Sequence, residues 1–323
     1  MTPPRIAELG EAFTVHEARA AGITSWQLRS GALEQPFHGV RLRPHMAADD
    51  DRHTASDAPY DAIRHEVIRR AAAYREIMRP GHFFVSDTAA LLYGLPIDHG
   101  HDLMVAAPRP ARAPRGRGIH GIQISPELVR VREHRGFRVS SPASTWATLG
   151  AARSVRDLVR VGDALVHVPR DDWGRPHPEV ALATIAELHA AVTAGRRVGV
   201  VALREAVELV RVGSASPLET DFRLDAASAG LPTPELDVEI FAADGRRIGI
   251  TEFVFREYRT VVEVEGDHHR TSRAQWNRDI EKYAAYAASG WEVVRLTSAH
   301  IRAPHARATQ IVRDVLARRG WRG

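Results

Sequence analysis

Hydrophobic and polar residues alternate most regularly in the C-terminal third of the chain, where three segments predict neighbouring β-strands. Glu235–Phe241 and Arg247–Phe255 flank an Asp-Gly turn and predict an antiparallel hairpin. Thr260–Glu265 follows after a short turn and predicts a third strand of the same sheet. Because side chains alternate between the two faces of a strand, Glu263 and Glu265 share one face.

Helical patterns occupy much of the remaining chain. The predicted helices are Val15–Ala21, Thr24–Arg29, Ala58–Ile77, Ser86–Leu92, Ser144–Leu149, Val155–Val166, Leu182–Ala194, Val200–Val212 and one that begins at Pro217. A further strand is predicted at 102–107, bounded by a proline. The mixture predicts an α/β fold, α+β overall, with a sheet flanked by helices in the C-terminal part.

The first 45 residues predict a winged helix-turn-helix. Thr14 and Thr24 are candidate N-caps and Gly22 a candidate residue after the first helix, which together spell helix, tight turn, helix. The alternating segment Gly31–Arg43 predicts a hairpin that acts as the wing.

In such a head the second helix faces a DNA groove and the wing contacts phosphates. The candidate DNA-binding residues are therefore Ser25, Gln27, Arg29, Arg41 and Arg43. A winged helix also serves protein contacts, so the alternative of a protein-binding head stays open.

Breaks in the pattern suggest three domains. The polar stretch Ala47–Asp51 is typical of a linker. It separates a winged helix at 1–45 from a mixed α/β middle domain at 58–212, and a third domain at 213–323 contains the three strands.

Composition narrows the class of protein without naming a partner. The chain has 323 residues, 44% of them hydrophobic, no cysteine and no apolar run long enough to span a bilayer. The N-terminus lacks a basic segment followed by an apolar stretch, so we expect a cytoplasmic protein without membrane attachment. The net charge of +4 is modest for this length.

Nearly all the positive charge is arginine, because Lys282 is the only lysine. Arginine suits bidentate phosphate contacts, but codon bias in a GC-rich genome explains the same composition. The loop Arg109–Gly118 concentrates four arginines between prolines and glycines, and is either a phosphate contact or a solvated loop.

Two carboxylates on one strand face repel each other unless a cation, a proton or solvent relieves the repulsion. If the repulsion between Glu263 and Glu265 serves a function, we expect a divalent metal ion to offset it. A hairpin between the second and third strands would bring Glu252 alongside them. Glu219 follows Ser216 by three residues, the spacing of a capping box, which is its structural explanation.

The C-terminal third resembles the DUF559 proteins, relatives of the very-short-patch-repair endonuclease within the PD-(D/E)XK nuclease superfamily. The resemblance covers about residues 214–317. It rests on Ser216-Pro-Leu-Glu219 with Arg223, Gly230-Leu-Pro, Glu263-Val-Glu265-Gly266 with His268 or His269, Asp279, and Gly290-Trp-Glu-Val-Val-Arg295.

The N-terminal half resembles the AbiEi-type antitoxin region that is often fused to this domain. That similarity runs through Gly22, Gly39-Val40, Ser86–Gly94 and Ser141–Thr145.

The first resemblance implies a metal-dependent DNA endonuclease that uses Mg²⁺ or Mn²⁺ and no small-molecule cofactor. It implies the metal ligands Glu219, Glu252, Glu263 and Glu265. Glutamates stand at 252 and 265, where the family usually carries aspartate, and Mg²⁺ tolerates misplaced ligands poorly.

No lysine is expected near the glutamate pair, since Lys282 lies on the following helix. Proton transfer is therefore assigned to metal-bound water or to His268 or His269. Arg270 and Arg273, with Arg278 beyond them, are candidate phosphate contacts, or else part of a solvated helix face.

The alternative hypothesis is an AbiEi-like antitoxin or DNA-binding regulator, with a possible toxin partner, whose nuclease fold no longer cleaves. A purely structural module offers no reason for the two strand glutamates to share a face. A zinc enzyme is disfavoured because no pair of histidines has helical ligand spacing.

Overall fold

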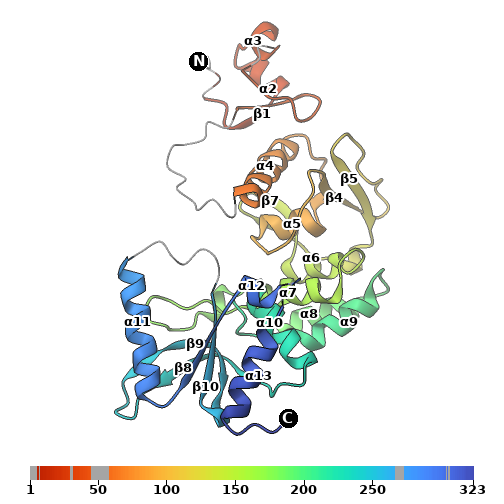
Figure 1. The fold of residues 1–323 in the computed structure, drawn as a ribbon. Helices are drawn as coiled ribbons and strands as arrows, with labels where there is room; N and C mark the ends of the chain where they lie inside the picture. The colour runs from red at the N-terminus through yellow and green to blue at the C-terminus, as the bar shows by residue number, and fades with distance from the viewer. Residues whose placement is uncertain are drawn as a thin grey trace. The chain divides into compact units, whose positions relative to one another are not determined.

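The computed structural model describes residues 6, 8–29, 32–44, 58–265, 273–302, 304 and 306–323, with the side chains of all of these except 58–61 and 273–279. Its contacts divide the chain into two compact units. Unit 1 contains residues 1–151 and 190–198, and unit 2 contains residues 152–189 and 199–323. Figure 1 shows the chain coloured from the N-terminus to the C-terminus.

Unit 1 begins with the small head. Its elements are β1 (Ala12–Thr14), α2 (Val15–Ala20), α3 (Ser25–Arg29) and β2 (Val40–Leu42). Thr14 caps α2 in a reciprocal capping box with Glu17, and Gly22 after the helix has a φ of 79°. Strand β1 pairs antiparallel with β2, and Glu34 forms an isolated bridge to Leu42. The cap residues read from the sequence are therefore the ones that shape this segment.

The rest of unit 1 is a sheet with helices packed against it. Its elements are α4 (Ala58–Arg75), β3 (Phe83–Phe84), α5 (Ser86–Leu92), β4 (Leu103–Pro108), β5 (Ile119–Ile124), β6 (Val131–His134), β7 (Phe137–Ser140) and α6 (Pro142–Leu149). The five strands lie in the order β5-β4-β3-β7-β6, with β4–β5 and β3–β7 parallel. The periodicity predicted β4 but not β3, β6 and β7, which have two to four residues, nor β5, whose six residues show no regular burial on one face.

Unit 2 starts with helices and ends with a second sheet. Its helices are α7 (Val155–Val166), α9 (Val200–Leu209), α10 (Pro217–Ser228), α11 (Arg273–Ala288), α12 (Ser298–Ile301) and α13 (Ala308–Arg318); α8 (Ile185–Thr193) runs across the unit boundary. Its strands are β8 (Glu235–Phe241), β9 (Arg247–Phe255), β10 (Thr260–Glu265) and β11 (Glu292–Thr297).

The strand order in unit 2 is β11-β10-β9-β8. The three strands predicted from alternation, β8, β9 and β10, are antiparallel neighbours with the predicted hairpin turns between them. Strand β11 runs parallel to β10, because α11 carries the chain back along the sheet before β11 begins. Helix α11 covers one face of the sheet, and α10 and α13 cover the other (Figure 1).

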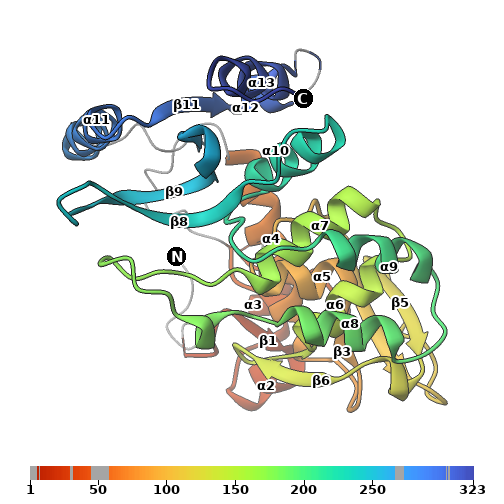
Figure 2. The ribbon, with the colours of Figure 1, turned by 90° about the horizontal axis from the view of Figure 1, so that it is seen from below.

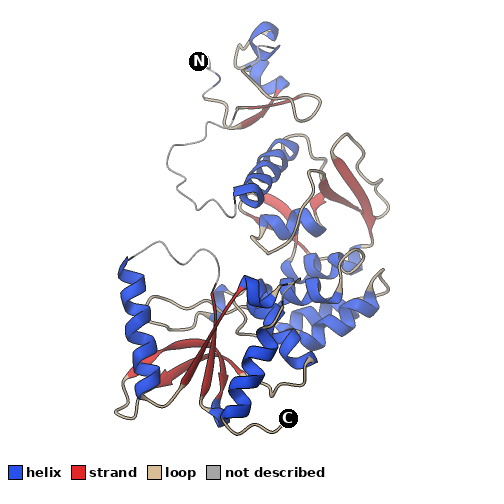
Figure 3. Ribbon diagram, viewed as in Figure 1, coloured by secondary structure: helices blue, strands red, loops and turns tan. Residues whose placement is uncertain are grey.

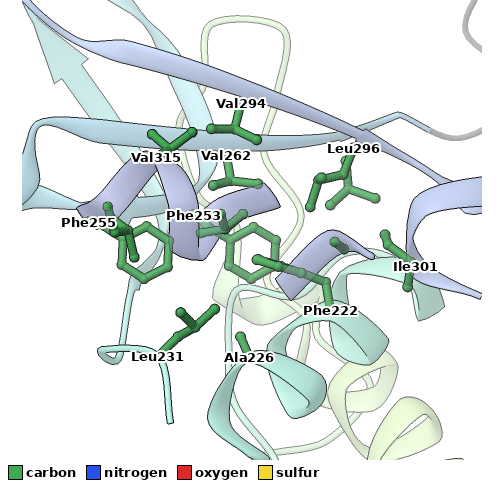
Figure 4. Packing of buried hydrophobic residues seen from close by; sticks show 14 residues of the cluster. Phe222, Ala226, Leu231, Phe253, Phe255, Val262, Val294, Leu296, Ile301 and Val315 are labelled. Atoms are coloured by element: carbon green, nitrogen blue, oxygen red, sulfur yellow. The ribbon is translucent and has the colours of Figure 1, made fainter. Parts of the chain in front are cut away.

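Each face of the sheet has its own hydrophobic core. The larger core joins Phe222 of α10 to Phe253, Val262 and Leu296 of the sheet and to Val315 of α13 (Figure 4). The rings of Phe222 and Phe253 meet edge to face with centroids 5.0 Å apart. A smaller core on the opposite face is formed by Ile240, Val254 and Val261 with Tyr286, Tyr283 and other residues of the α11 side.

Helices and mixed sheets occur in both units (Figure 3), so the fold is α/β, as predicted. The compact units do not follow the sequence boundaries, because the division at 151/152 falls inside the predicted middle domain 58–212. The reason is that α7 packs against both α9 and α10, which belong to unit 2. Within the described residues, no helix is both long and apolar enough to cross a membrane.

Candidate active site

Three carboxylates of unit 2 interact with one another and define the carboxylate cluster: Glu219, Glu252 and Glu263. They come from the first turn of α10, from β9 and from β10. Glu219 and Glu263 are 5% and 8% exposed, although both are glutamates. Buried carboxylates are costly unless they are paired, protonated or bound to a cation, so this cluster is the first candidate for chemistry.

Local sequence places Glu219 in the first helical turn. Ser216 is the N-cap, its hydroxyl accepts from the Glu219 N–H at 3.2 Å, and Pro217 occupies the first turn. The predicted capping box forms in one direction only. The Glu219 carboxylate accepts from the Ala215 N–H at 2.7 Å, and no bond from it to the Ser216 N–H is present. Glu219 is therefore held at the helix start in a fixed position.

The pairing of β9 with β10 explains how Glu252 reaches the cluster. The antiparallel register covers Thr260–Val262 and ends there, where Val262 faces Phe253. Beyond that point the Glu252 carboxylate accepts a hydrogen bond from the Val264 N–H. A side chain thus replaces a backbone partner of β10, which brings the Glu252 carboxylate beside the strand that carries Glu263.

Glu252 and Glu263 lie on the face of the sheet that α11 covers. Each lies two residues from a member of the smaller core, Val254 and Val261 respectively, and strand residues two apart share a face. The Lys282 ammonium of α11 donates to Glu263 Oε1 at 2.9 Å and to the Ile250 carbonyl at 2.9 Å. The expectation that no lysine lies near the glutamates is wrong, because the crossover from β10 to β11 folds α11 back over the strands.

Burial and mutual repulsion favour the protonated forms of two cluster members. Burial raises the pKa of the Glu252 carboxyl to about 9, and the negative charges of Glu219 and Glu263 add to the shift. The Val264 N–H and Lys282 act in the opposite direction. Burial likewise raises the pKa of Glu219, against hydrogen bonds from the Ala215 N–H and from the Ser216 side chain. A bound cation would therefore offset the repulsion among the carboxylates of the cluster.

Tyr286 of α11 adds a buried hydroxyl on the same face. The residue is fully buried, and its hydroxyl has no hydrogen-bond partner within the described part of the chain. Burial, and next the charge of Glu263, raise the pKa of this phenol. A Cβ at Gly249 would lie 3.0 Å from Lys282 Cε and 3.3 Å from the Tyr286 hydroxyl. Gly249 therefore keeps space for both groups.

Asp237 of β8 is a further acidic neighbour that the sequence reasoning missed. Its charge raises the pKa of Glu219, and Arg170 donates to its carboxylate at 2.8 Å. Arg170 belongs to the loop between α7 and α8, which runs alongside the edge strand β8 (Figure 2). The signal was an acidic residue between Leu236 and Val238 in a strand, the same signal that identified Glu263.

Glu265, a predicted metal ligand, is engaged elsewhere. Its carboxylate forms an ion pair with Arg295 of β11, whose guanidinium lies 4.8 Å from the ring centroid of Tyr283. Among the predicted ligands, Glu219, Glu252 and Glu263 are thus brought together, and Glu265 is paired with an arginine.

The fit to a metal ion is partial. Oxygen donors on buried carboxylates suit a hard cation such as Mg²⁺. Across the described residues, however, no group of three or more histidine, aspartate or glutamate side chains is arranged to hold a metal. His268, His269 and Arg270 lie outside the described residues; Arg273 begins α11, and its side chain is not described.

The predicted DNA-binding residues of the head have different surroundings. Arg29 at the end of α3 is exposed, and the neighbouring Trp26 is 75% exposed. Gln27 is used locally, since its side-chain oxygen accepts from the Thr24 N–H at 2.8 Å. Arg41 donates to the Leu28 carbonyl at 2.9 Å and so closes the end of α3.

Ser25 and Arg43 are half-buried. The Arg43 carbonyl accepts from Arg69 of α4 at 2.7 Å, which ties the strand end to that helix. The exposed face of α3 therefore presents Trp26 and Arg29, and Trp26 was not among the residues that the sequence singled out.

Comparison with known proteins finds relatives without an assigned activity. The chain is 26% identical over 294 residues to the uncharacterized protein Rv2248 of Mycobacterium tuberculosis strain H37Rv, covering 90% of this chain and 94% of that protein. The uncharacterized protein MT2308 of strain CDC 1551 / Oshkosh matches to the same extent. No protein-family model matches the chain. The resemblance to DUF559 and AbiEi proteins therefore stays a prediction.

Proposed function

We propose that this protein is a metal-dependent DNA endonuclease whose site is the carboxylate cluster with Lys282. The observation that carries the proposal is the convergence of three glutamates: Glu219 and Glu263 are buried, and Glu252 is half-buried with a carboxyl pKa raised to about 9. Lys282 offsets the charge of only one of the three carboxylates, so the site is suited to take up a divalent cation. Unit 2 also has the sheet flanked by helices that the nuclease resemblance implies.

The chain's own residues have distinct roles in this proposal. Glu219, Glu252 and Glu263 would hold Mg²⁺ or Mn²⁺, which when bound supplies positive charge against the charge that develops on the phosphoryl group. Glu252 must lose its proton to become a ligand, so cation binding should release a proton and strengthen as the pH rises. Lys282 holds Glu263 in place and presents a cation on the same face of the sheet.

The head supports DNA as the substrate class. The second helix of the helix-turn-helix is short and carries the exposed Trp26 and Arg29. An exposed aromatic residue beside an arginine suits contact with nucleic acid. Binding by the head and hydrolysis in unit 2 are separate expectations that need separate measurements.

A second candidate function is a DNA-binding regulator of the antitoxin type that does not cleave. The observation that favours it is charge compensation by the protein itself: Lys282 pairs with Glu263 and Arg295 pairs with Glu265. An ammonium that already neutralises a carboxylate takes the place that a metal ion would otherwise have. A toxin partner belongs to this second candidate.

Cleavage assays distinguish the two functions. Purified protein is incubated with supercoiled plasmid and with mismatched duplex DNA, each with Mg²⁺ or Mn²⁺. We expect nicking that falls by about 10²-fold or more in Glu252→Gln and Lys282→Met, since the first removes a proposed metal ligand and the second removes the ammonium of the site. Glu257→Gln, at an exposed carboxylate of the β9–β10 turn, is the matched control and should nick like the unmodified protein.

The outcomes separate cleanly. Equal nicking by the protein and by Glu252→Gln would show that the activity lies elsewhere or comes from a contaminant. No nicking with either ion, together with retained DNA binding in a gel-shift assay, would support the regulator. The gel-shift is run at two salt concentrations, because phosphate contacts weaken with salt.

A further inference from the structure

Unit 1 contains a cavity that neither the carboxylate cluster nor the DNA-binding face of α3 explains. Its volume is about 780 Å³, within the range of small-molecule sites. Its lining includes the wing segment 34–38, the turn 115–119, Tyr74 of α4 and Ile77 just after that helix. The lining that matters for recognition is Tyr74, Ile77, Asp102, Arg115 and Arg117.

The turn that carries the two arginines is held in place by specific contacts. The Gln123 amide donates to the Ala111 carbonyl at 2.7 Å, which anchors the start of the arginine-rich loop. A Cβ at Gly121 would lie 1.8 Å from the Pro114 carbonyl oxygen, so only glycine allows this close approach. The loop is therefore fixed although it contains no helix or strand.

Arg70 of α4 also contacts the turn that carries the two arginines. It donates to the His101 carbonyl at 2.6 Å, and its guanidinium lies 5.7 Å from the ring centroid of Phe37 in the wing. A Cβ at Gly118 would lie 2.1 Å from the Arg70 guanidinium. Arg70 is thus occupied by structural contacts and helps to define the walls of the cavity.

Three acidic residues, Glu34, Glu66 and Asp102, line the cavity together with Arg115 and Arg117. The acidic residues Glu34 and Glu66 both pair with Arg69, at 3.1 and 3.2 Å. Arg115 and Arg117 are exposed and have no ion pair or hydrogen bond to any residue that the structure describes. Two guanidinium groups on one turn, without an ion pair to the acidic residues of the lining, are suited to a phosphate group.

The other side of the cavity is aromatic and apolar. The Tyr74 ring meets Phe37 edge to face with centroids 5.2 Å apart, which holds the phenol in position. Ile77, 39% exposed, lies in the turn that follows the end of α4 at Arg75. A flat base can pack on such a surface, and the Asp102 carboxylate can accept from a hydroxyl or an amino group.

We propose that this cavity binds a nucleoside phosphate, with the phosphate on Arg115 and Arg117 and the base against Tyr74 and Ile77. The same chemistry is offered by a free nucleotide and by the phosphorylated end of a nucleic-acid strand. Because the walls belong to the wing and to the arginine-rich turn, the bound ligand would link the head to the body of unit 1. The proposal does not depend on nuclease activity.

Isothermal titration calorimetry on the full chain in 150 mM salt tests the site. The probes are ADP, inorganic phosphate, and a thymidine dodecamer with and without a 5′-phosphate. We expect a Kd below about 1 mM for ADP or for the phosphorylated dodecamer. The double variant Arg115→Ala/Arg117→Ala should bind at least ten-fold more weakly. Arg112→Ala, in the same loop but outside the cavity lining, should bind like the unmodified protein.

The relative affinities of the probes identify the source of the ligand and test the site. Preference for ADP identifies a free nucleotide, and preference for the phosphorylated over the unphosphorylated dodecamer identifies a strand end. Three results would overturn the site. These are no saturable binding of ADP or the phosphorylated dodecamer, equal affinity for ADP and inorganic phosphate, and equal weakening by Arg112→Ala.

Discussion

At the residue scale, the informative feature is an acidic side chain at a strand position that should be apolar. Glu263 showed this feature in the sequence and is buried in the structure. Glu265 shares its face by alternation, yet it pairs with Arg295. The difference comes from the parallel neighbour β11, which places Arg295 opposite Glu263 and within reach of Glu265. Local pattern identified the face but could not assign a partner to each carboxylate.

Glu252 makes stability depend on pH in a direction opposite to that of most carboxylates. Its pKa is raised from 4.5 in the unfolded chain to about 9 in the folded protein, so the folded state holds the proton more tightly. The protonated Glu252 carboxyl therefore makes its full contribution to the unfolding free energy below about pH 4.5, and this contribution is lost as the pH rises towards 9. Thermal unfolding without divalent cations should show a lower Tm at pH 8.5 than at pH 5.5.

Glu252→Gln should make the unfolding free energy depend less on pH, and should raise it at pH 8.5 by about 1 kcal/mol or more. The reason is that an amide stays neutral without binding a proton. The control is Glu235→Gln, whose carboxyl has a pKa lowered by Arg256 at the surface and should give no such gain. A Glu252→Gln curve parallel to that of the unmodified protein would contradict the assignment of a protonated Glu252.

At the element scale, α7 and α10 are joined by charge as well as by apolar contact. Asp163 of α7 is 1% exposed and accepts from Arg223 at 2.6 Å, from Thr220 at 2.8 Å and from the Arg211 N–H at 2.8 Å. A second pair, between Arg160 and Asp221, connects the same helices. The sequence predicted both helices but gave no sign that they meet, because their contact residues are about 60 positions apart.

Removal of Asp163 should lower the unfolding free energy, because it leaves a buried charge without its partner. In Asp163→Ala the Arg223 side chain, 11% exposed, keeps its charge without its carboxylate, so we expect a loss of about 3 kcal/mol of unfolding free energy. Asp157→Ala breaks an ion pair on the same helix with an aspartate that is 41% exposed, and should cost less than about 1 kcal/mol. Urea denaturation measures both, and similar losses would refute the distinction.

At the scale of the whole molecule, the chain passes between its two units three times. The crossings fall at 151/152, 189/190 and 198/199, whereas the composition suggested boundaries near 45–58 and at 212/213. A linear boundary read from sequence cannot detect that α7, which lies within the predicted middle domain, packs with α10. The C-terminal unit is therefore larger than the segment that resembles a nuclease.

This division predicts the behaviour of fragments. A fragment of residues 213–323 lacks α7, and so loses the partners of Asp221 and Arg223. A fragment of residues 152–323 keeps them. We expect the longer fragment to unfold at a higher urea concentration by circular dichroism, with a difference of about 2 kcal/mol or more. Equal midpoints would show that α7 and α9 contribute nothing to the stability of the second sheet.

The sequence by itself determined the local structure of this protein: the caps at Thr14 and Ser216, the strands β8, β9 and β10, their hairpin turns and the shared face of the two glutamates. These features depend on residues a few positions apart, which pattern and capping rules describe. Only the tertiary structure brought Lys282 to Glu263, Asp237 to Glu219 and Asp163 to Arg223. Those contacts join elements separated by a crossover helix or by tens of residues, where no local periodicity records which side chains will meet.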